Sequence, residues 1–323
     1  MSERFIVRFW GVRGSHPVPG PATVRYGGNT PSVEVQAGQQ TIILDAGTGI
    51  IPLGRELARR ARESGAPMRT TLLFSHMHHD HTQGFPFFAP AYHPKAHLNV
   101  MGPGLQERDF EKTLSQVMVP ANFPVRLLEM RSTKQIRSLR EHEVVLLNDS
   151  ADGLTIHTVG QELPPQDERV RIRVLHSPAH PNGVYVYRIE WRGRSLVYAT
   201  YTEGYVSTDR RLVNFARGAD LLIHDAQYTD EHYLGKVPFV SATQGWGHST
   251  ATMACAAAKE AGVGQLVLFH FDPTYNDELI ADIEARAQGY FARARAAYEG
   301  LEIDLLEQNI LPQVVLTERE VEV

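Results

Sequence analysis

The sequence predicts a mixed α/β (α+β) fold in which two β-sheets pack together and helices cover them. Many short apolar segments indicate strands, and helical segments interrupt these strands without a strict alternation of strand and helix. Several of the apolar runs end in polar residues, as is common where a sheet presents a site. With 323 residues, of which 42% are hydrophobic, the chain is long enough to bury a large core.

The N-terminal part begins with short segments rich in β-branched and aromatic residues, separated by glycine-containing turns. After the stretch TIILDAGTG, apolar residues recur at helical spacing among arginines, which predicts a helix containing Leu53, Leu57 and Ala61. The run TTLLFS is almost continuously apolar, as expected of a strand buried on both faces. The strands predicted in this part cover 5–10, 32–35, 41–44 and 70–75.

The rest of the chain continues the mixed pattern. A strand at 97–102 and an amphipathic helix at 107–118 precede a region of weak signal, about 120–140. We treat 1–323 as a single domain, and we consider 105–140 a candidate lid or dimer-contact insertion. Further strands are predicted at 143–147, 153–159, 169–177, 184–191, 195–200, 220–226 and 265–271, and helices around 209–217, 249–261 and 277–298.

Composition narrows the class of protein. The net charge of −5 and the absence of a basic block make nucleic acid an unexpected partner, unless a local patch exists. The single cysteine, Cys255, excludes an internal disulfide framework and a cysteine-ligated zinc site, and we expect it to be buried and inert. The chain starts without a signal-like apolar core and contains no apolar run of membrane-spanning length. We therefore expect a soluble, cytoplasmic protein that does not enter the membrane.

The stretch SHMHHDH, residues 75–81, carries the strongest chemical signal. In an extended chain His76 and His78 point the same way, so both can hold one ion, whereas His79 faces the opposite side. Asp80 and His81 follow as the chain turns and can aim at a second point a few ångströms away. Imidazole and carboxylate ligands suit zinc, iron or manganese, and two such ions can hold a shared hydroxide. The stretch therefore provides two half-sites for metal ions.

The pattern H-x-H-x-D-H in this stretch resembles the hallmark of the metallo-β-lactamase superfamily. The segments FWGVRGS, YGGNTPSVEV, ILDAGTG, LLIHDAQY, GHST and LVLFHFDP are similar to a bacterial branch near the phosphodiesterases and the tRNA 3′-end processing ribonucleases. The resemblance runs over nearly the whole chain. It implies a four-layer αβ/βα sandwich with the metals at one edge, between the two sheets.

The resemblance also implies the remaining ligands. His180, in SPAHPNG, best matches the histidine that completes the first site, and we expect its competitor His176 to serve in packing. His270, in LVLFHFD, matches the late histidine of the second site. The two expected ligand sets are His76, His78 and His180, and Asp80, His81 and His270.

Other residues have expected roles around these ligands. Asp45 is a candidate to orient a ligating histidine, although it is equally suited to a turn between strand and helix. Asp225 is a similar candidate for support. His248, in GHST, resembles the family's active-site histidine and is expected to act catalytically together with Asp80. Arg13 is a weaker candidate to contact an anionic substrate, with a solvent-exposed turn arginine as the alternative.

Tyr201 is the departure from the family pattern. The family usually carries a bridging aspartate in a stretch like ATDTE, and here the stretch is ATYTE. A phenol, with a pKa of about 10, neither neutralises charge between two cations nor holds their separation unless a metal deprotonates it. Four explanations are open: the second ion is weak or lost, Tyr201 ligates as a phenolate, Glu203 or Asp225 substitutes as the carboxylate, or ordinary hydrolysis is impaired.

The leading functional hypothesis is a metal-dependent hydrolase in which a metal-bound hydroxide attacks a phosphodiester or similar ester. A cyclic nucleotide or a small phosphodiester is the favoured substrate. A second hypothesis is an iron-dependent, non-hydrolytic or oxidative enzyme that uses Tyr201 near the metal. A third is a binding or regulatory protein of the same fold with reduced catalysis. We expect one or two divalent ions, zinc before iron or manganese, a small-molecule substrate as partner, and consider a homodimer.

Overall fold

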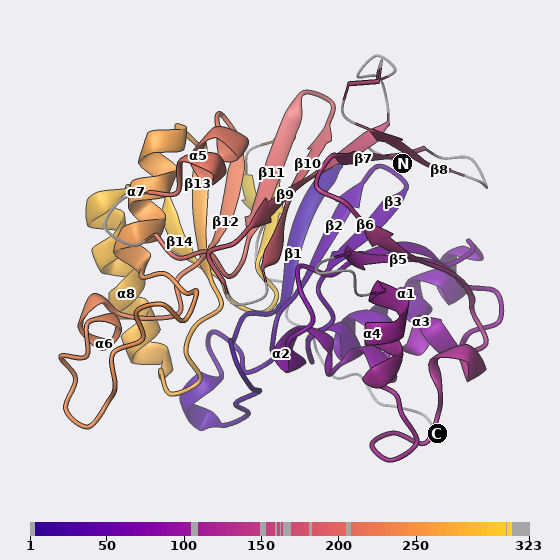
Figure 1. The fold of residues 1–323 in the computed structure, drawn as a ribbon, viewed down its shortest axis with the longest axis horizontal. Helices are drawn as coiled ribbons and strands as arrows, with labels where there is room; N and C mark the ends of the chain where they lie inside the picture. The colour runs from indigo at the N-terminus through magenta and orange to yellow at the C-terminus, as the bar shows by residue number, and fades with distance from the viewer. Residues whose placement is uncertain are drawn as a thin grey trace.

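The computed structural model describes residues 4–311, apart from 105–108, 149–152, 159, 162, 164–168, 181–182, 205–207 and 308. Within this part the chain forms two eight-stranded sheets. Figure 1 shows the strands in the middle of the molecule, between helices. In spatial order, the first sheet contains β16 (Asn309–Leu311), β15 (Glu302–Asp304), β1 (Phe5–Gly11), β2 (Ser32–Ala37), β3 (Gln40–Leu44), β4 (Arg69–Leu73), β5 (His97–Pro103) and β6 (Thr133–Leu139).

The second sheet has the same number of strands and comes mostly from the second half of the chain. In spatial order, it contains β14 (Ala294–Ala296), β13 (Gln265–Phe269), β12 (Leu221–Asp225), β11 (Arg194–Ala199), β10 (Val184–Trp191), β9 (Val170–Ser177), β7 (Glu143–Leu147) and β8 (Leu154–Thr158). Hairpin-linked strands pair antiparallel in both sheets, and each sheet also has a parallel block, β3 to β6 and β11 to β14.

Helices lie against the outer faces of the sheets, one group at each side of the molecule in Figure 1. The first group contains α1 (Ile50–Ser64), η2 (Phe85–Phe87), α3 (Ala89–Tyr92), α4 (Phe110–Gln116) and η3 (Leu127–Glu129), whereas the short α2 (His79–Thr82) lies near the middle of the view, below the sheets. The second contains α5 (Arg210–Ala216), α6 (Asp230–Tyr233), α7 (Ala251–Ala261) and α8 (Asp277–Tyr290), and η1 (Pro21–Thr23) lies in the loop after β1. The arrangement confirms the predicted sandwich of two sheets between helices.

Two apolar clusters account for the layers. The larger fills the space between the sheets, where for example the rings of Phe9 and Phe269 have centroids 5.9 Å apart, and it also packs α5, α7 and α8 against the second sheet. The smaller packs the first sheet against its helices and includes Ile43, Leu53 and Phe110. Strands buried on both faces explain the continuous apolar runs of the sequence, because each face of these strands meets a different layer.

The segment predicted as a lid or dimer-contact insertion contributes to the body of the fold. β6 pairs in parallel with β5 along its full length. Phe110 and Leu114 of α4 are buried in the smaller cluster. Residues 105–108 lie outside the described part, and a dimer contact in this segment stays a prediction.

The helix predicted at 277–298 was too long. α8 ends at Tyr290, and Ala294–Ala296 instead form β14, which pairs in parallel with β13. The run ARARAA favours a helix locally, but the sheet edge offers backbone hydrogen bonds that local propensity cannot report. In the described part of the chain, no helix is long and apolar enough to cross a membrane.

Gly84 provides a test of the packing beneath the stretch of residues 75–81. A Cβ at this position would lie 2.0 Å from the carbonyl oxygen of Gly47, which is backbone and cannot rotate away. We expect Gly84→Ala to lower the free energy of unfolding by about 1–3 kcal/mol, because the two loops must separate. Gly289 is the matched control: a Cβ there meets no atom within 4 Å, and it lies in α8. Gly289→Ala should be neutral or stabilising by up to about 1 kcal/mol in urea unfolding.

Candidate metal centre

The expected site residues gather at one edge of the sandwich, where strands of both parallel blocks end. Asp45 follows β3 and the stretch 75–81 follows β4, both in the first sheet. In the second sheet, Tyr201 follows β11, Asp225 ends β12, and His270 follows β13. Because the carboxyl ends of parallel strands meet at the same edge, residues far apart in the sequence come together.

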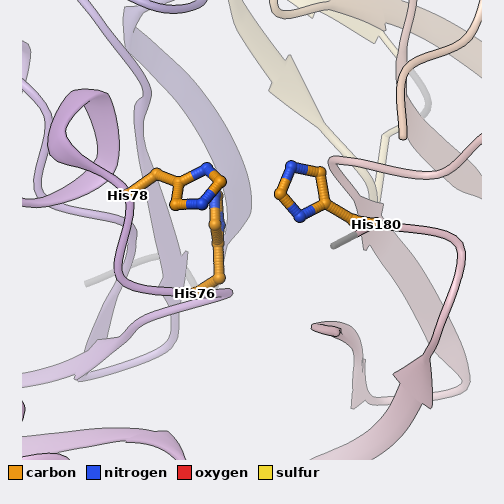
Figure 2. Close-up of side chains that lie close together, drawn as sticks. All are labelled: His76, His78 and His180. Carbon is orange, nitrogen blue, oxygen red and sulfur yellow. The ribbon is translucent and has the colours of Figure 1, made fainter. Parts of the chain in front are cut away.

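His76, His78 and His180 form the first cluster, with ring nitrogens that lie within 4.8 Å of one another. Figure 2 shows His76 and His78 on one side facing His180 on the other, so the two halves of the fold each contribute. The ring centroids are 4.6 Å apart for His76 and His78, and 4.7 Å apart for His78 and His180. His78 is exposed whereas the other two are buried, so the cluster has an open side.

The hydrogen bonds of His76 support a metal at this cluster. Its Nδ1 lies 3.0 Å from the hydroxyl oxygen of Ser75, which fixes the direction of the ring. Its Nε2 is buried and has no hydrogen-bond partner among the described residues. A buried nitrogen without a partner is costly unless something binds it, and a metal ion is the partner that three convergent imidazoles suit. The cluster therefore fits a divalent ion.

The second expected set, Asp80, His81 and His270, also comes together. Oδ2 of Asp80 lies 3.0 Å from Nε2 of His270 and 3.4 Å from Nε2 of His81. The two histidine Nε2 atoms are 3.2 Å apart. Unlike Nε2 of His76, these polar atoms have partners within hydrogen-bonding distance. Oδ2 of Asp80 also accepts a hydrogen bond from the backbone N–H of Ser15 at 2.9 Å.

Asp45 is fully buried and holds the stretch of residues 75–81 in place. Its carboxylate accepts hydrogen bonds from the backbone N–H of Ser75 at 2.7 Å and from the hydroxyl of Ser75 at 2.8 Å. Oδ2 also lies 2.7 Å from Nδ1 of His81 and accepts a hydrogen bond from the phenol of Tyr198 at 2.8 Å. Burial opposes protonation of His81, but Asp45 and Asp80 outweigh it and raise the pKa of His81 to about 10. The two roles considered for Asp45 coincide, since it is both a turn residue and a partner of a histidine.

Tyr201 lies among the histidines of both sets. Its backbone has a φ of 57°, and its side chain is buried. The ring centroid is 4.1 Å from that of His76 and 4.5 Å from that of His270. The hydroxyl donates a hydrogen bond to Oδ2 of Asp80 at 2.8 Å. Burial, reinforced by the carboxylate of Asp80, raises the pKa of Tyr201 well above its ordinary value.

Asp225 and His248 form a carboxylate–histidine pair beside this group. Oδ2 of Asp225 lies 2.8 Å from Nδ1 of His248, and Oδ1 accepts a hydrogen bond from the N–H of Ser249 at 2.9 Å. Burial disfavours the ionised form, but the neighbouring imidazoles and the Ser249 N–H outweigh it and lower the pKa of Asp225. The ring of His248 is stacked on that of His270, with centroids 5.3 Å apart. Asp225 therefore orients His248, and both of its oxygens are engaged.

Glu203 does not substitute for the missing bridging carboxylate in this structure. It is buried, and its Oε1 accepts hydrogen bonds from the hydroxyl of Tyr233 at 2.6 Å and from the N–H of Gly245 at 2.8 Å. Oε2 accepts a hydrogen bond from the N–H of Gly247 at 2.9 Å. Glu203 thus holds the loop that leads to His248. Its partners, one side-chain hydroxyl and two backbone N–H groups, lie 30 or more residues further along the chain, which sequence spacing does not reveal.

Arg13 neither faces the candidate site nor lies in solvent, so both expectations for this residue disagree with the structure. The side chain is fully buried. Its guanidinium donates hydrogen bonds to the carbonyl oxygens of Gly27 at 2.8 Å and Tyr275 at 2.5 Å. Arg13 therefore ties the loop after β1 to the segment after β13.

Two supporting residues escaped the sequence analysis. The phenol of Tyr198 binds Asp45 from the opposite sheet. The side-chain carbonyl of Gln227 lies 3.0 Å from Nδ1 of His270 and so orients that ring. Gln227 could have been found from the sequence, because it lies in DAQY, two residues after the candidate Asp225. Tyr198 lies within a strand and has no such signal. His176, half-buried with its ring 6.1 Å from that of Tyr185, stays outside the cluster.

Removal of the Asp45 carboxylate tests whether it organises the site. We expect Asp45→Ala to lower the free energy of unfolding by about 3–5 kcal/mol, because it leaves Ser75, His81 and Tyr198 without their buried partner. Asp282 provides a surface control, since the ion pair it forms among the described residues is with Arg286 on α8. Asp282→Ala should change the free energy by less than about 0.5 kcal/mol. Similar losses in urea unfolding of both variants would contradict the proposed role.

Comparison with known proteins agrees with this geometry. Residues 40–271 match the family model described as a beta-lactamase superfamily domain. The chain is 25% identical over 312 residues to a Ribonuclease Z of Thermoplasma acidophilum, covering 89% of this chain and 93% of the relative. It is 30% identical over 259 residues to a Ribonuclease Z of Ignicoccus hospitalis, covering 72% and 80%.

Solved structures show the same fold at low sequence identity. The metallo-beta-lactamase fold protein YhfI from Bacillus subtilis matches with a TM-score of 0.63 at 17% identity, covering 94% of this chain and all of that one. The short form of human tRNase Z matches with a TM-score of 0.56 at 18% identity, covering 93% and 99%. The chain therefore belongs to the beta-lactamase superfamily, whose domain model it matches, and it has the metallo-β-lactamase fold.

Proposed function

We propose that this protein is a metal-dependent phosphodiesterase and that its substrate is RNA. The observation that carries the proposal is the convergence of His76, His78 and His180, with the buried, unpartnered Nε2 of His76, beside the Asp225–His248 pair. The three imidazoles would hold the ion, and zinc is the ion that an all-histidine set suits best. A bound divalent ion supplies Lewis-acid polarisation of a phosphoryl oxygen and an activated water.

His248 is the residue we assign to proton transfer. Its Nδ1 is held by Asp225, so Nε2 is the nitrogen that remains to contact a substrate oxygen. The ring centroid of His248 lies 5.8 Å from that of His180, close enough for both residues to face one phosphodiester. His248 would donate a proton to the leaving oxygen, and Asp225 would stabilise the charged imidazolium before that transfer.

The relatives named Ribonuclease Z support RNA as the substrate class, in place of the small phosphodiester favoured by the sequence. Two of them align over most of their own length. The sequence argument against nucleic acid used the net charge of the whole chain, −5, which averages over the entire surface. An RNA backbone needs favourable charge only where it meets the site, and a divalent ion bound there supplies part of that charge.

Substitution of neighbouring histidines tests the metal-dependent reaction. His78→Ala should reduce cleavage of a precursor tRNA at least about 100-fold, because it removes one of three ligands. His79→Ala is the control: this exposed residue lies one position away and outside the clusters found among the described residues. His79→Ala should retain activity within about twofold. Equal loss in both variants, or no cleavage by the unmodified protein with zinc or manganese added, would contradict the proposal.

Loss of the His248 imidazole should affect chemistry without affecting metal binding. We expect His248→Ala to lower kcat about 10²–10³-fold, the range for removal of a group that stabilises or protonates the reacting oxygens. The zinc content should equal that of the unmodified protein. His176→Ala, a histidine outside the cluster, should retain kcat. Parallel assays on bis(p-nitrophenyl) phosphate and cyclic AMP separate the substrate classes, and faster turnover of either than of RNA would argue against the RNA assignment.

A further inference from the structure

We propose that this protein binds a single metal ion, at His76, His78 and His180, and that Tyr201 occupies the position a second ion would need. The inference rests on the metal centre of the proposed function but is independent of the identity of the substrate. It selects one of the explanations that the sequence left open for Tyr201.

The position of the Tyr201 ring is the first argument. Its centroid lies 4.1 Å from that of His76, 4.3 Å from that of His248, and 4.5 Å from those of His180 and His270. A six-membered ring at these distances is in van der Waals contact with imidazoles of both expected sets. The side chain therefore fills the space between the three-histidine cluster and the second set.

The contacts of Asp80 are the second argument. Its Oδ2 receives the Tyr201 hydroxyl at 2.8 Å and the Ser15 N–H at 2.9 Å, and the Nε2 atoms of His270 and His81 lie at 3.0 and 3.4 Å. These four contacts surround the Asp80 oxygen that faces His81 and His270. The second set is thus satisfied by its own hydrogen bonds, in contrast to the buried Nε2 of His76.

Charge provides the third argument. Two divalent ions about 3.5–4 Å apart repel each other strongly, and a carboxylate between them offsets part of that repulsion. Tyr201 has no carboxylate to place between two ions, and its hydroxyl is directed at Oδ2 of Asp80. Asp45 is hydrogen-bonded to Ser75. Asp225 forms a group with His248 and His270 that could hold an ion, but it is already hydrogen-bonded to His248 and Ser249. The described residues around Tyr201 therefore favour one ion over two.

Metal stoichiometry of the full-length protein tests the inference directly. The chelator-stripped protein is dialysed against micromolar zinc and its zinc content is measured by ICP-MS. We expect one zinc per chain in the unmodified protein and in Tyr201→Phe, because the ring remains in place. Tyr201→Asp removes the ring and restores a carboxylate, and it should bind two. Tyr187→Phe is the matched control, since this buried phenol donates to the Phe74 carbonyl outside the cluster, and it should bind one.

Several results would overturn the inference. Two zinc ions in the unmodified protein would show that Tyr201 does not exclude the second. A fall from two to one in Tyr201→Phe, or a visible phenolate-to-iron absorption band after loading with ferric iron, would make Tyr201 a ligand instead. No zinc in the unmodified protein would remove the three-histidine site as well. The unmodified protein alone decides between one ion and two if Tyr201→Asp fails to fold.

The stoichiometry also separates this inference from the proposed function. One zinc per chain without RNA cleavage would leave the inference standing and reject the substrate. RNA cleavage by a protein that binds two zinc ions would support the function and reject the inference.

Discussion

The carboxylate of Asp45 is the interaction on which the site depends. It lies at the end of β3 and binds Ser75 and His81, the first and last residues of the histidine-rich stretch after β4. It also binds the phenol of Tyr198, which belongs to β11 in the other sheet. One buried side chain therefore connects both layers at the edge where the candidate ligands converge. Its left-handed backbone conformation, with a φ of 62°, turns the carboxylate towards these partners.

The sequence predicted those parts of the structure that local pattern determines. The apolar runs predicted the strands. The polar residues at the ends of these runs, such as Asp45 and Asp225, indicated the edge of the sheets at which the site forms. The spacing of His76 and His78 gave half of the first cluster. His180 and His270 required the family resemblance, because nothing near them in the sequence points to the strand ends they meet in space.

The features that the sequence did not reveal depend on partners distant along the chain. Arg13 resembled a surface residue, and only the folded chain brings it the carbonyl oxygens of Gly27 and Tyr275. Glu203 resembled a spare ligand, but Tyr233 and the loop that follows it supply its observed partners. The end of α8 at Tyr290 similarly depends on the free edge of β13. In each case, tertiary hydrogen bonding outweighs what the neighbouring residues favour.

The three-histidine cluster draws its ligands from both halves of the sandwich, at positions 76 and 180. An ion bound there would join two segments of the chain in the way that a disulfide does, by closing a long loop. While the metal stays bound, such a cross-link restricts the unfolded chain more than the folded chain. Metal binding and folding are therefore coupled equilibria. The free metal concentration would then set the protein's resistance to unfolding as well as its chemistry, and a chelator would act on both at once.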